Sequence, residues 1–239
     1  MKVELNIPNT QEEITVGRYL DWIQLDFEGQ TEQFQRERVI QIFCGVPLEL
    51  IYKIKRSDFL QISSHIFAVL QEKQEFKPRV KIGPVEYGFI PNLNEITTGE
   101  YIDLDIFFSE KESLHKAMAV LYRPIITRIG ESYRIKNYKG MDKSENLMKK
   151  LPLSVANGAM LFFYRLSKKL LRITPNYLRS ELNKQNSKQL ELLLAKNGVG
   201  INTYIHSLEE IISNLSGLLN QNYYQPFNSS PFQKITTTA

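Results

Sequence analysis

The sequence predicts an α+β protein, mostly helical, with two repeated strand-turn-helix modules that contain small β-hairpins and precede a helical C-terminal part. Three observations support this prediction. Residues 3–22 recur as residues 85–104, short alternating apolar segments precede the predicted helices, and longer segments carry apolar residues three and four positions apart. The expected domains are a first module at 1–74, a second at 75–172 with a basic insertion at 125–150, helices at 173–220 and a polar extended tail at 221–239.

The repeat consists of three matched blocks. Val3-Glu4-Leu5 corresponds to Val85-Glu86-Tyr87, and Ile7-Pro8-Asn9 corresponds to Ile90-Pro91-Asn92. The third block, Glu13-Ile14-Thr15-Val16-Gly17-Arg18-Tyr19-Leu20-Asp21, corresponds to Glu95-Ile96-Thr97-Thr98-Gly99-Glu100-Tyr101-Ile102-Asp103. One inserted and one deleted residue reconcile the two copies, so chance is a poor explanation of the match.

Each shared position has a structural interpretation. Proline ends the strand, asparagine tolerates the turn, threonine caps the helix, and glycine admits another backbone or makes room for the strand. We expect Asp21 and Asp103 to hold a basic or amide donor across the interface between the copies. In the alternative, Asp21, Asp26, Asp103 and Asp105 form a carboxylate cluster for a metal, but no histidine–carboxylate spacing supports it.

In the first module, alternation predicts a strand from Val3 to Ile7, which Pro8 ends. Thr10 or Thr15 caps a helix that runs to Gly29. A helix at 32–44 stops at Gly45. The remaining elements are a short helix from Pro47 and a longer one from Ser57 to Leu70.

In the second module, Val80 to Phe89 predict a hairpin that turns at Gly83-Pro84. A helix follows from Thr97 or Thr98 to about Phe108. The next helix covers 109–122, and Pro124 stops it. Residues 125–138 predict one or two strands, a turn follows at Lys139-Gly140, and a long buried helix at 152–171 corresponds to the one at 57–70.

The last third shows no visible repeat. Helices are expected from Pro175, from Ser187 and over 203–219, where apolar residues recur at three and four positions. After Gln221 the chain has too little apolar content to pack on itself. It is either a free tail or an arm that orders against a neighbouring subunit through Tyr223, Tyr224, Phe227 and Phe232.

Composition is that of an ordinary globular protein, with 42% hydrophobic and 23% charged residues. Cys44 is the only cysteine, sits in an apolar run and predicts no disulfide. We expect no signal peptide and no membrane span, because the longest apolar stretch, 151–166, is short and contains polar residues. His65, His115 and His206 lie scattered among apolar helices, and no nucleophile, phosphate-loop or zinc motif is present, so we expect no enzyme, metal or cofactor.

Charge is distributed unevenly along the chain. Residues 1–122 carry 13 basic and 19 acidic residues, whereas residues 123–184 carry 14 basic and 4 acidic residues. The basic segment either contacts nucleic acid or an acidic partner, or it is a solvated face that pairs with the acidic first half. The candidate contact residues are Lys136, Lys139, Lys149, Lys150, Lys168 and Lys169.

Several of these segments resemble known phage proteins. The repeat block from Val85 to Asp105 and the segment from Lys116 to Pro124 resemble proteins encoded in the structural gene region of tailed bacteriophages, including crAss-like phages. Residues 42–50, followed by Ser57-Asp58-Phe59, are similar to phage tail assembly chaperones, in which an apolar helix ends at a leucine-leucine-x-glycine stop. The resemblance covers roughly residues 1–124 and implies no catalytic residue.

The resemblance implies a non-enzymatic virion component of the neck or tail, a head-to-tail connector or tail ring, assembled in the host cytoplasm. Its partners would be other phage structural proteins and further copies of itself in a ring. The alternatives are a tail assembly chaperone that is absent from the mature virion, and a nucleic-acid-binding protein that uses residues 123–184.

Overall fold

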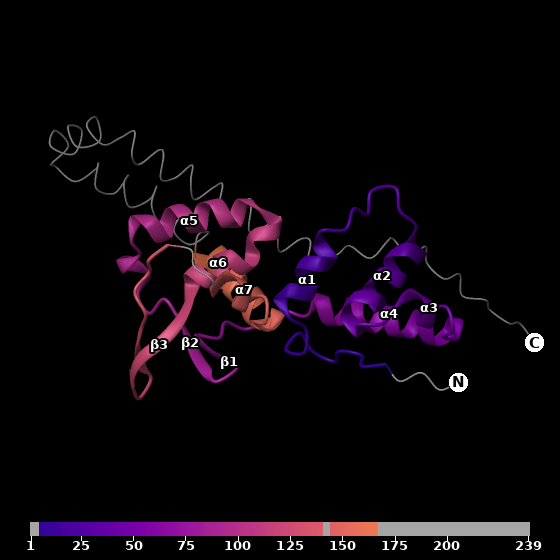
Figure 1. Cartoon of the computed structure of the whole chain (residues 1–239), viewed down its shortest axis with the longest axis horizontal. Helices are drawn as coiled ribbons and strands as arrows, with labels where there is room; N and C mark the ends of the chain where they lie inside the picture. The colour runs from indigo at the N-terminus through magenta and orange to yellow at the C-terminus, as the bar shows by residue number, and fades with distance from the viewer. Residues whose placement is uncertain (1–4, 141–143, 167–239) are drawn as a thin grey trace, which may run out of the picture.

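The computed structural model describes residues 5–140 and 144–166, so the predictions for 173–220 and 221–239 lie outside it. The described chain is α+β and mostly helical, with eight α-helices and a four-stranded antiparallel sheet (Figure 1). Its elements are α1 (Val16–Ile23), α2 (Glu32–Cys44), α3 (Leu48–Ile51), α4 (Arg56–Gln71), β1 (Arg79–Ile82), β2 (Val85–Phe89), α5 (Thr98–Ser109), α6 (Leu114–Leu121), β3 (Tyr122–Ile129), β4 (Ser132–Ile135), α7 (Ser144–Met148) and a helix at 153–166. Short 3-10 turns at Leu93–Glu95 and Lys111–Ser113 precede α5 and α6.

The repeat threonines begin a helix in each copy, as predicted. Thr15 Oγ1 accepts from the Arg18 backbone N–H at 3.3 Å, and Thr97 Oγ1 accepts from that of Glu100 at 3.3 Å. The Glu100 carboxylate in turn accepts from the Thr97 backbone N–H at 2.7 Å, which completes a capping box. Both caps satisfy donors that a helix N-terminus leaves free.

The predicted first strand is not formed in its described part. Residues 5–8 have no regular secondary structure, and the four strands of the described chain lie between 79 and 135. A strand needs a neighbour to take its backbone hydrogen bonds. The second copy has that neighbour because the turn at Gly83-Pro84 brings β1 back beside β2, whereas no strand precedes or flanks residues 5–8 in the described structure. The two copies therefore share helix caps but not a hairpin.

Aromatic packing also shortens the first predicted helix. α1 ends at Ile23, well before the expected Gly29. The chain then bends so that the Phe27 ring lies 4.5 Å from the Trp22 ring, and Trp22 packs in turn on Phe43 and Phe67. The next helix has the predicted bounds, since Gly45 ends α2 in a left-handed conformation with φ of 67°.

The sheet has the order β1-β2-β3-β4 and includes the predicted hairpin. The prediction that Pro124 stops the preceding helix is wrong. α6 ends at Leu121 and the chain passes directly into β3, in which Pro124 lies opposite Tyr87. The Tyr122 hydroxyl holds this junction by donating to the Lys77 carbonyl at 2.7 Å. The insertion contributes most of β3, all of β4 and α7, a helix that we did not predict.

Residues 153–166 confirm the predicted long helix as far as the described chain extends. Its first turns are fully buried, and its Phe162 ring lies 4.5 Å from Phe76 and 5.7 Å from Phe89 on β2. Figure 1 shows α1–α4 at one end of the molecule and the sheet with α5–α7 at the other. One continuous apolar core joins the two ends.

The first prediction concerns Gly158, where the long helix meets the chain that follows α4. A Cβ at Gly158 would lie well inside van der Waals distance of the Glu75 carbonyl oxygen, which is backbone and cannot rotate away. Gly158→Ala should therefore lower the free energy of unfolding by about 1–3 kcal/mol. Urea unfolding followed by circular dichroism measures the change.

Gly99→Ala is the matched control, because a Cβ at Gly99 has no neighbour within 4 Å. That substitution should leave stability unchanged or raise it by up to about 1 kcal/mol, since alanine favours a helix over glycine. Equal unfolding midpoints for the two variants would show that the contact at Gly158 is not tight.

Candidate functional site

The repeat motif of the first copy lies at a junction between two helix N-termini. The Val16 and Gly17 N–H groups at the start of α1 donate to the Leu151 and Lys149 carbonyls, each at 2.8 Å. The Leu153 N–H at the start of the long helix donates back to the Ile14 carbonyl at 2.8 Å. Thr15 and Pro152 form the antiparallel bridge between these bonds. Each segment thus satisfies donors that the other helix leaves free.

Gln11 adds buried side-chain bonds to this junction. Its Nε2 lies 2.9 Å from the Val69 carbonyl, 3.1 Å from that of Leu70 and 2.9 Å from that of Glu72, at the end of α4. Its Oε1 accepts from Asn157 Nδ2 at 2.6 Å. Glu12 beside it pairs with Lys77 at 2.7 Å and accepts from the Ser154 hydroxyl. These groups join α4 to the long helix, and sequence analysis did not identify Gln11 or Asn157.

Burial and the contacts of Glu12 act in opposite directions on its carboxyl pKa. Partial burial raises the pKa, while the Lys77 ammonium and the Ser154 hydroxyl lower it, and the net shift is downward. The carboxylate is therefore held in its charged form beside Lys77. This is the signature of an ion pair and not of a carboxyl group prepared to donate a proton.

The glycine shared by the two copies of the repeat makes a close backbone contact in the first copy alone. A Cβ at Gly17 would lie 3.1 Å from the Lys149 carbonyl oxygen, so the close approach of α1 to the turn before the long helix favours glycine there. At Gly99 nothing lies within 4 Å. The predicted close approach is confirmed for the first copy and wrong for the second, because α5 starts against no other backbone.

The second copy buries an ion pair at the equivalent helix start. Glu100 Oε1 lies 2.5 Å from Arg123 Nη2, and the two side chains are 4% and 12% exposed. The Arg123 guanidinium also lies over the Tyr138 ring, 5.7 Å from its centre. Burial lowers the pKa of Arg123 although Glu100 opposes this shift, so the pair is desolvated. The pair fixes α5 against the start of β3.

Asp103 completes this polar group, though not in the predicted way. Its carboxylate accepts from the Tyr138 hydroxyl within the second module, instead of holding a donor across the interface between copies. Burial and this hydrogen bond raise the pKa of Tyr138, so its phenol stays protonated. Asp21 lies exposed on α1. Among residues 5–140 and 144–166 there is no group of histidine, cysteine or carboxylate side chains that could hold a metal.

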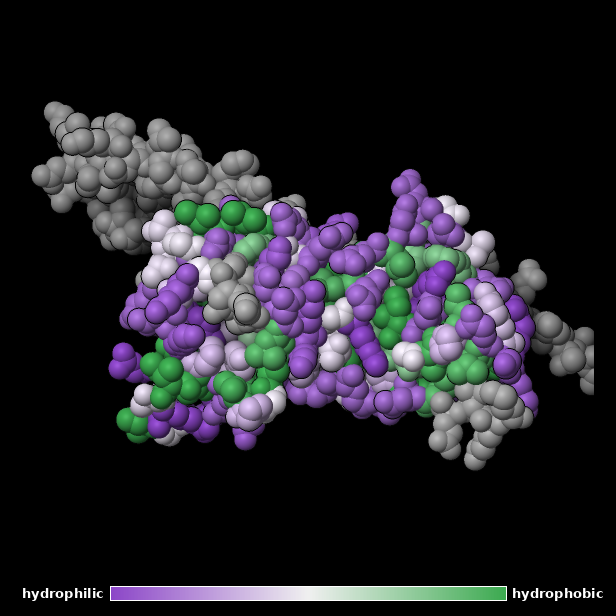
Figure 2. Space-filling model, viewed as in Figure 1, coloured by the Kyte–Doolittle hydropathy of each residue, from purple (hydrophilic) through white to green (hydrophobic). Residues whose placement is uncertain are grey.

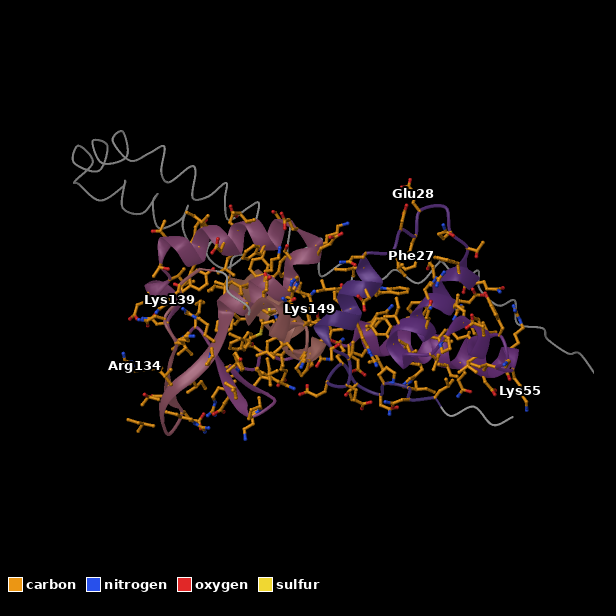
Figure 3. All side chains as sticks on the ribbon, viewed as in Figure 1. Phe27, Glu28, Lys55, Arg134, Lys139 and Lys149 are labelled. Carbon is orange, nitrogen blue, oxygen red and sulfur yellow. The ribbon has the colours of Figure 1, made fainter. Side chains whose placement is uncertain are left out.

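The predicted lysines lie in two places. Lys136 and Lys139 are exposed at and after the end of β4, and Lys149 and Lys150 are exposed in the turn after α7. Figure 3 shows Lys139 at the hairpin end of the molecule, near Arg134, and Lys149 in the middle beside α1. Lys168 and Lys169 lie outside the described residues, as do Tyr223, Tyr224, Phe227 and Phe232.

Two pairs of exposed isoleucines on the second module were missed by sequence analysis. Ile102 and Ile106 are 51% and 47% exposed on α5, and Ile126 and Ile129 are 59% and 79% exposed on β3. Figure 2 shows apolar residues in a row along the outer side of α5. The i, i+4 spacing of Ile102 and Ile106 was visible in the sequence. Only the fold shows that no other described element covers this side of the helix.

The cysteine and the histidines show no reactive arrangement. Cys44 is buried as predicted, and burial raises the pKa of its thiol to about 11 although Arg18 opposes this shift. His65 is exposed on α4, whereas His115 is buried on α6, where burial and then Lys149 lower its pKa. His206 lies outside the described residues. No described helix is both long and apolar enough to cross a membrane.

The second prediction concerns the Glu100–Arg123 pair. Arg123→Met removes the partner of a buried carboxylate that has 4% side-chain exposure, and should destabilise the protein by about 3–5 kcal/mol. Adding Glu100→Gln should recover most of this loss, because glutamine is neutral and still caps the Thr97 N–H. Urea unfolding of the two variants tests this coupling. Equal stability of the single and double variants would contradict it.

Comparison of the chain with protein-family models, with curated proteins and with solved structures found no match. The description of this protein therefore depends on its own residues. Those residues offer two kinds of polar group. One is buried in structural hydrogen bonds at helix starts, and the other consists of exposed cations on the β3–β4 ribbon that pair with no described carboxylate.

Proposed function

We propose that this chain is a non-enzymatic structural protein of a tailed-phage virion, in the neck or tail, that acts through contacts with other structural proteins and with copies of itself. The observation that carries the proposal is the pair of exposed isoleucine surfaces on α5 and β3. Pairs of large apolar side chains that stay about half exposed beside charged residues are typical of protein interfaces.

The use of the motif residues supports the same proposal. Thr15, Thr97 and Glu100 cap helices, Gly17 admits a carbonyl and Asp103 fixes Tyr138. The polar groups of these residues are therefore used in hydrogen bonds and close contacts that stabilise the fold. A rigid scaffold that presents apolar surfaces is what a ring or connector subunit requires. The resemblance of residues 85–124 to proteins of phage structural gene regions agrees with this role.

The third prediction separates a virion component from an assembly chaperone. Mass spectrometry of purified particles of the phage that encodes this chain should detect it in an amount comparable to other neck and tail proteins. A chaperone would instead co-purify with a tail protein from infected cells and be missing from finished particles. Absence from both samples would reject both roles.

Nucleic-acid binding is a second candidate, favoured by one observation. Arg134, Lys136 and Lys139 are exposed on or just after β4, and none of them forms an ion pair with a described carboxylate. Unpaired cations that gather on one strand attract phosphates. A two-stranded ribbon such as β3–β4 also has the dimensions to enter a DNA groove.

The fourth prediction tests this candidate by titration of a DNA duplex at several salt concentrations. Binding through the ribbon should weaken steeply with salt, by about 0.9 in the log–log slope for each phosphate contacted. Replacing Arg134, Lys136 and Lys139 by glutamate should abolish it, whereas replacing Lys149 and Lys150, which lie at the other position, is the matched control. Unchanged binding after glutamate replacement of Lys136, Lys139, Lys149, Lys150, Lys168 and Lys169 would exclude the basic segment.

A further inference from the structure

The β3–β4 ribbon has one packed face and one solvent face. β3 is buried at Tyr122 and exposed from Ile126 onward, and beyond Pro124 it pairs only with β4. On the packed face, the Tyr133 hydroxyl lies 2.9 Å from the Phe89 carbonyl and 3.1 Å from that of Pro78. The ribbon is therefore held against β2 and the chain before β1.

The charged residues on the packed face of the ribbon and in its turn form ion pairs with residues of β1 and β2. Arg128 lies opposite Tyr133 in the register and reaches Glu86 at 3.4 Å, and Glu131 in the turn pairs with Arg79 at 2.7 Å. Because side chains alternate along a strand, Ile129 and Arg134 belong to the other face. That face is turned to solvent, with Ile129 79% exposed. It combines Ile129 with cations that no described carboxylate pairs, and Ile126, which is 59% exposed, lies at the register shift between Ile125 and Thr127 on the same ribbon.

The outer side of α5 has the complementary composition. Ile102 and Ile106 lie one turn apart and are half exposed. Residues 98–112 contain five carboxylates and a single lysine. Glu100 is buried in the pair with Arg123 and Asp103 accepts from Tyr138, whereas Glu110 and Glu112 are exposed just beyond the end of α5. The α5 surface thus has two exposed isoleucines near carboxylates, whereas the ribbon surface has two exposed isoleucines near arginine and lysine side chains.

The two surfaces cannot meet within one molecule. Figure 1 shows α5 along the top of this part of the molecule and the β3–β4 turn at the lower end of the strands, away from α5. Figure 2 shows the apolar residues of α5 and those at the ribbon tip well separated on the same view. The ribbon of one copy must therefore reach the α5 surface of another copy if the two are to pair.

We propose that the solvent face of the β3–β4 ribbon of one copy docks on the Ile102–Ile106 side of α5 in a second copy. Isoleucine packs on isoleucine, and Arg134, Lys136 and Lys139 face the acidic end of the α5 surface, where Glu110 and Glu112 are exposed just beyond the helix, so apolar area and charge match together. The contact joins two different surfaces and is heterologous, which lets it propagate into a ring. This inference rests on the proposed function, because the contact would join neighbouring copies in such a ring. The contact can nevertheless be measured on the isolated protein.

The fifth prediction uses two complementary variants of the full chain. In the ribbon variant, Ile129→Glu with Arg134→Glu makes the ribbon acidic. In the α5 variant, Ile102→Gln with Ile106→Gln removes the apolar row and keeps good helix formers. Size-exclusion chromatography with light scattering should show an oligomer for the unchanged protein and a monomer for each variant. The dissociation constant of the contact should rise by at least about tenfold in each variant, which corresponds to about 1.4 kcal/mol.

Mixing the two variants gives the sharpest outcome. The α5 variant retains a ribbon and the ribbon variant retains an α5 surface, so a 1:1 mixture should form a dimer with one intact contact and no larger species. Leu60→Gln, which alters an exposed apolar residue of α4, is the control and should leave assembly unchanged. Circular dichroism and melting temperature check that each variant is folded.

Several results would overturn the proposal: an unchanged protein that is monomeric, variants that still assemble, or a mixture that stays monomeric. Variants that assemble normally but lose DNA binding would assign the ribbon to nucleic acid. The two proposals can fail separately. If the protein assembles as described but is absent from virions, the contact between copies stands and only the proposed phage function is rejected.

Discussion

Two helix N-termini that are distant in the sequence share their hydrogen-bonding groups, and the relative position of the two modules depends on this contact. α1 takes its first acceptors from residues 149–151, and the helix at 153–166 takes an acceptor from Ile14. A buried backbone donor without a partner costs about 1–3 kcal/mol, so neither helix start is stable in this setting without the other. Gln11 extends the contact to the end of α4.

This constraint explains how the molecule divides its polar chemistry. Inside, polar side chains pair with backbone or with one another at helix starts, as Gln11 does with Asn157 and Glu100 with Arg123. Outside, the second module retains isoleucines and cations that the described chain does not use. Because these buried polar groups are hydrogen-bonded within the fold, the exposed isoleucines and cations remain available for contacts with partners. The copies differ in this respect, because the exposed isoleucines of α5 and β3 belong to the second module.

Local signals predicted much of the fold. The threonine caps, the Gly45 stop and the Gly83-Pro84 hairpin follow from short-range chemistry, and each has its predicted place. The errors arise where a partner decides the outcome. Residues 5–8 alternate like a strand but lack a strand beside them, and Pro124 sits within β3 because its position opposite Tyr87 is held by the contacts of Tyr122. The candidate surfaces were harder to predict, since exposure is a property of the neighbours and not of Ile102 or Ile129.

The sequence by itself determined that a short motif recurs, that the chain is mostly helical and that matching threonines cap helices, because caps, turns and helical periodicity depend on residues within a few positions of one another. Tertiary structure decided what each copy does with the shared motif. In the first copy, Gly17 meets a carbonyl from residue 149 and the motif becomes a junction. In the second, a Cβ at Gly99 would have no neighbour within 4 Å, Glu100 forms a buried ion pair, and no described element covers the exposed isoleucines of the helix. The same residues thus acquire different roles because different segments pack against them.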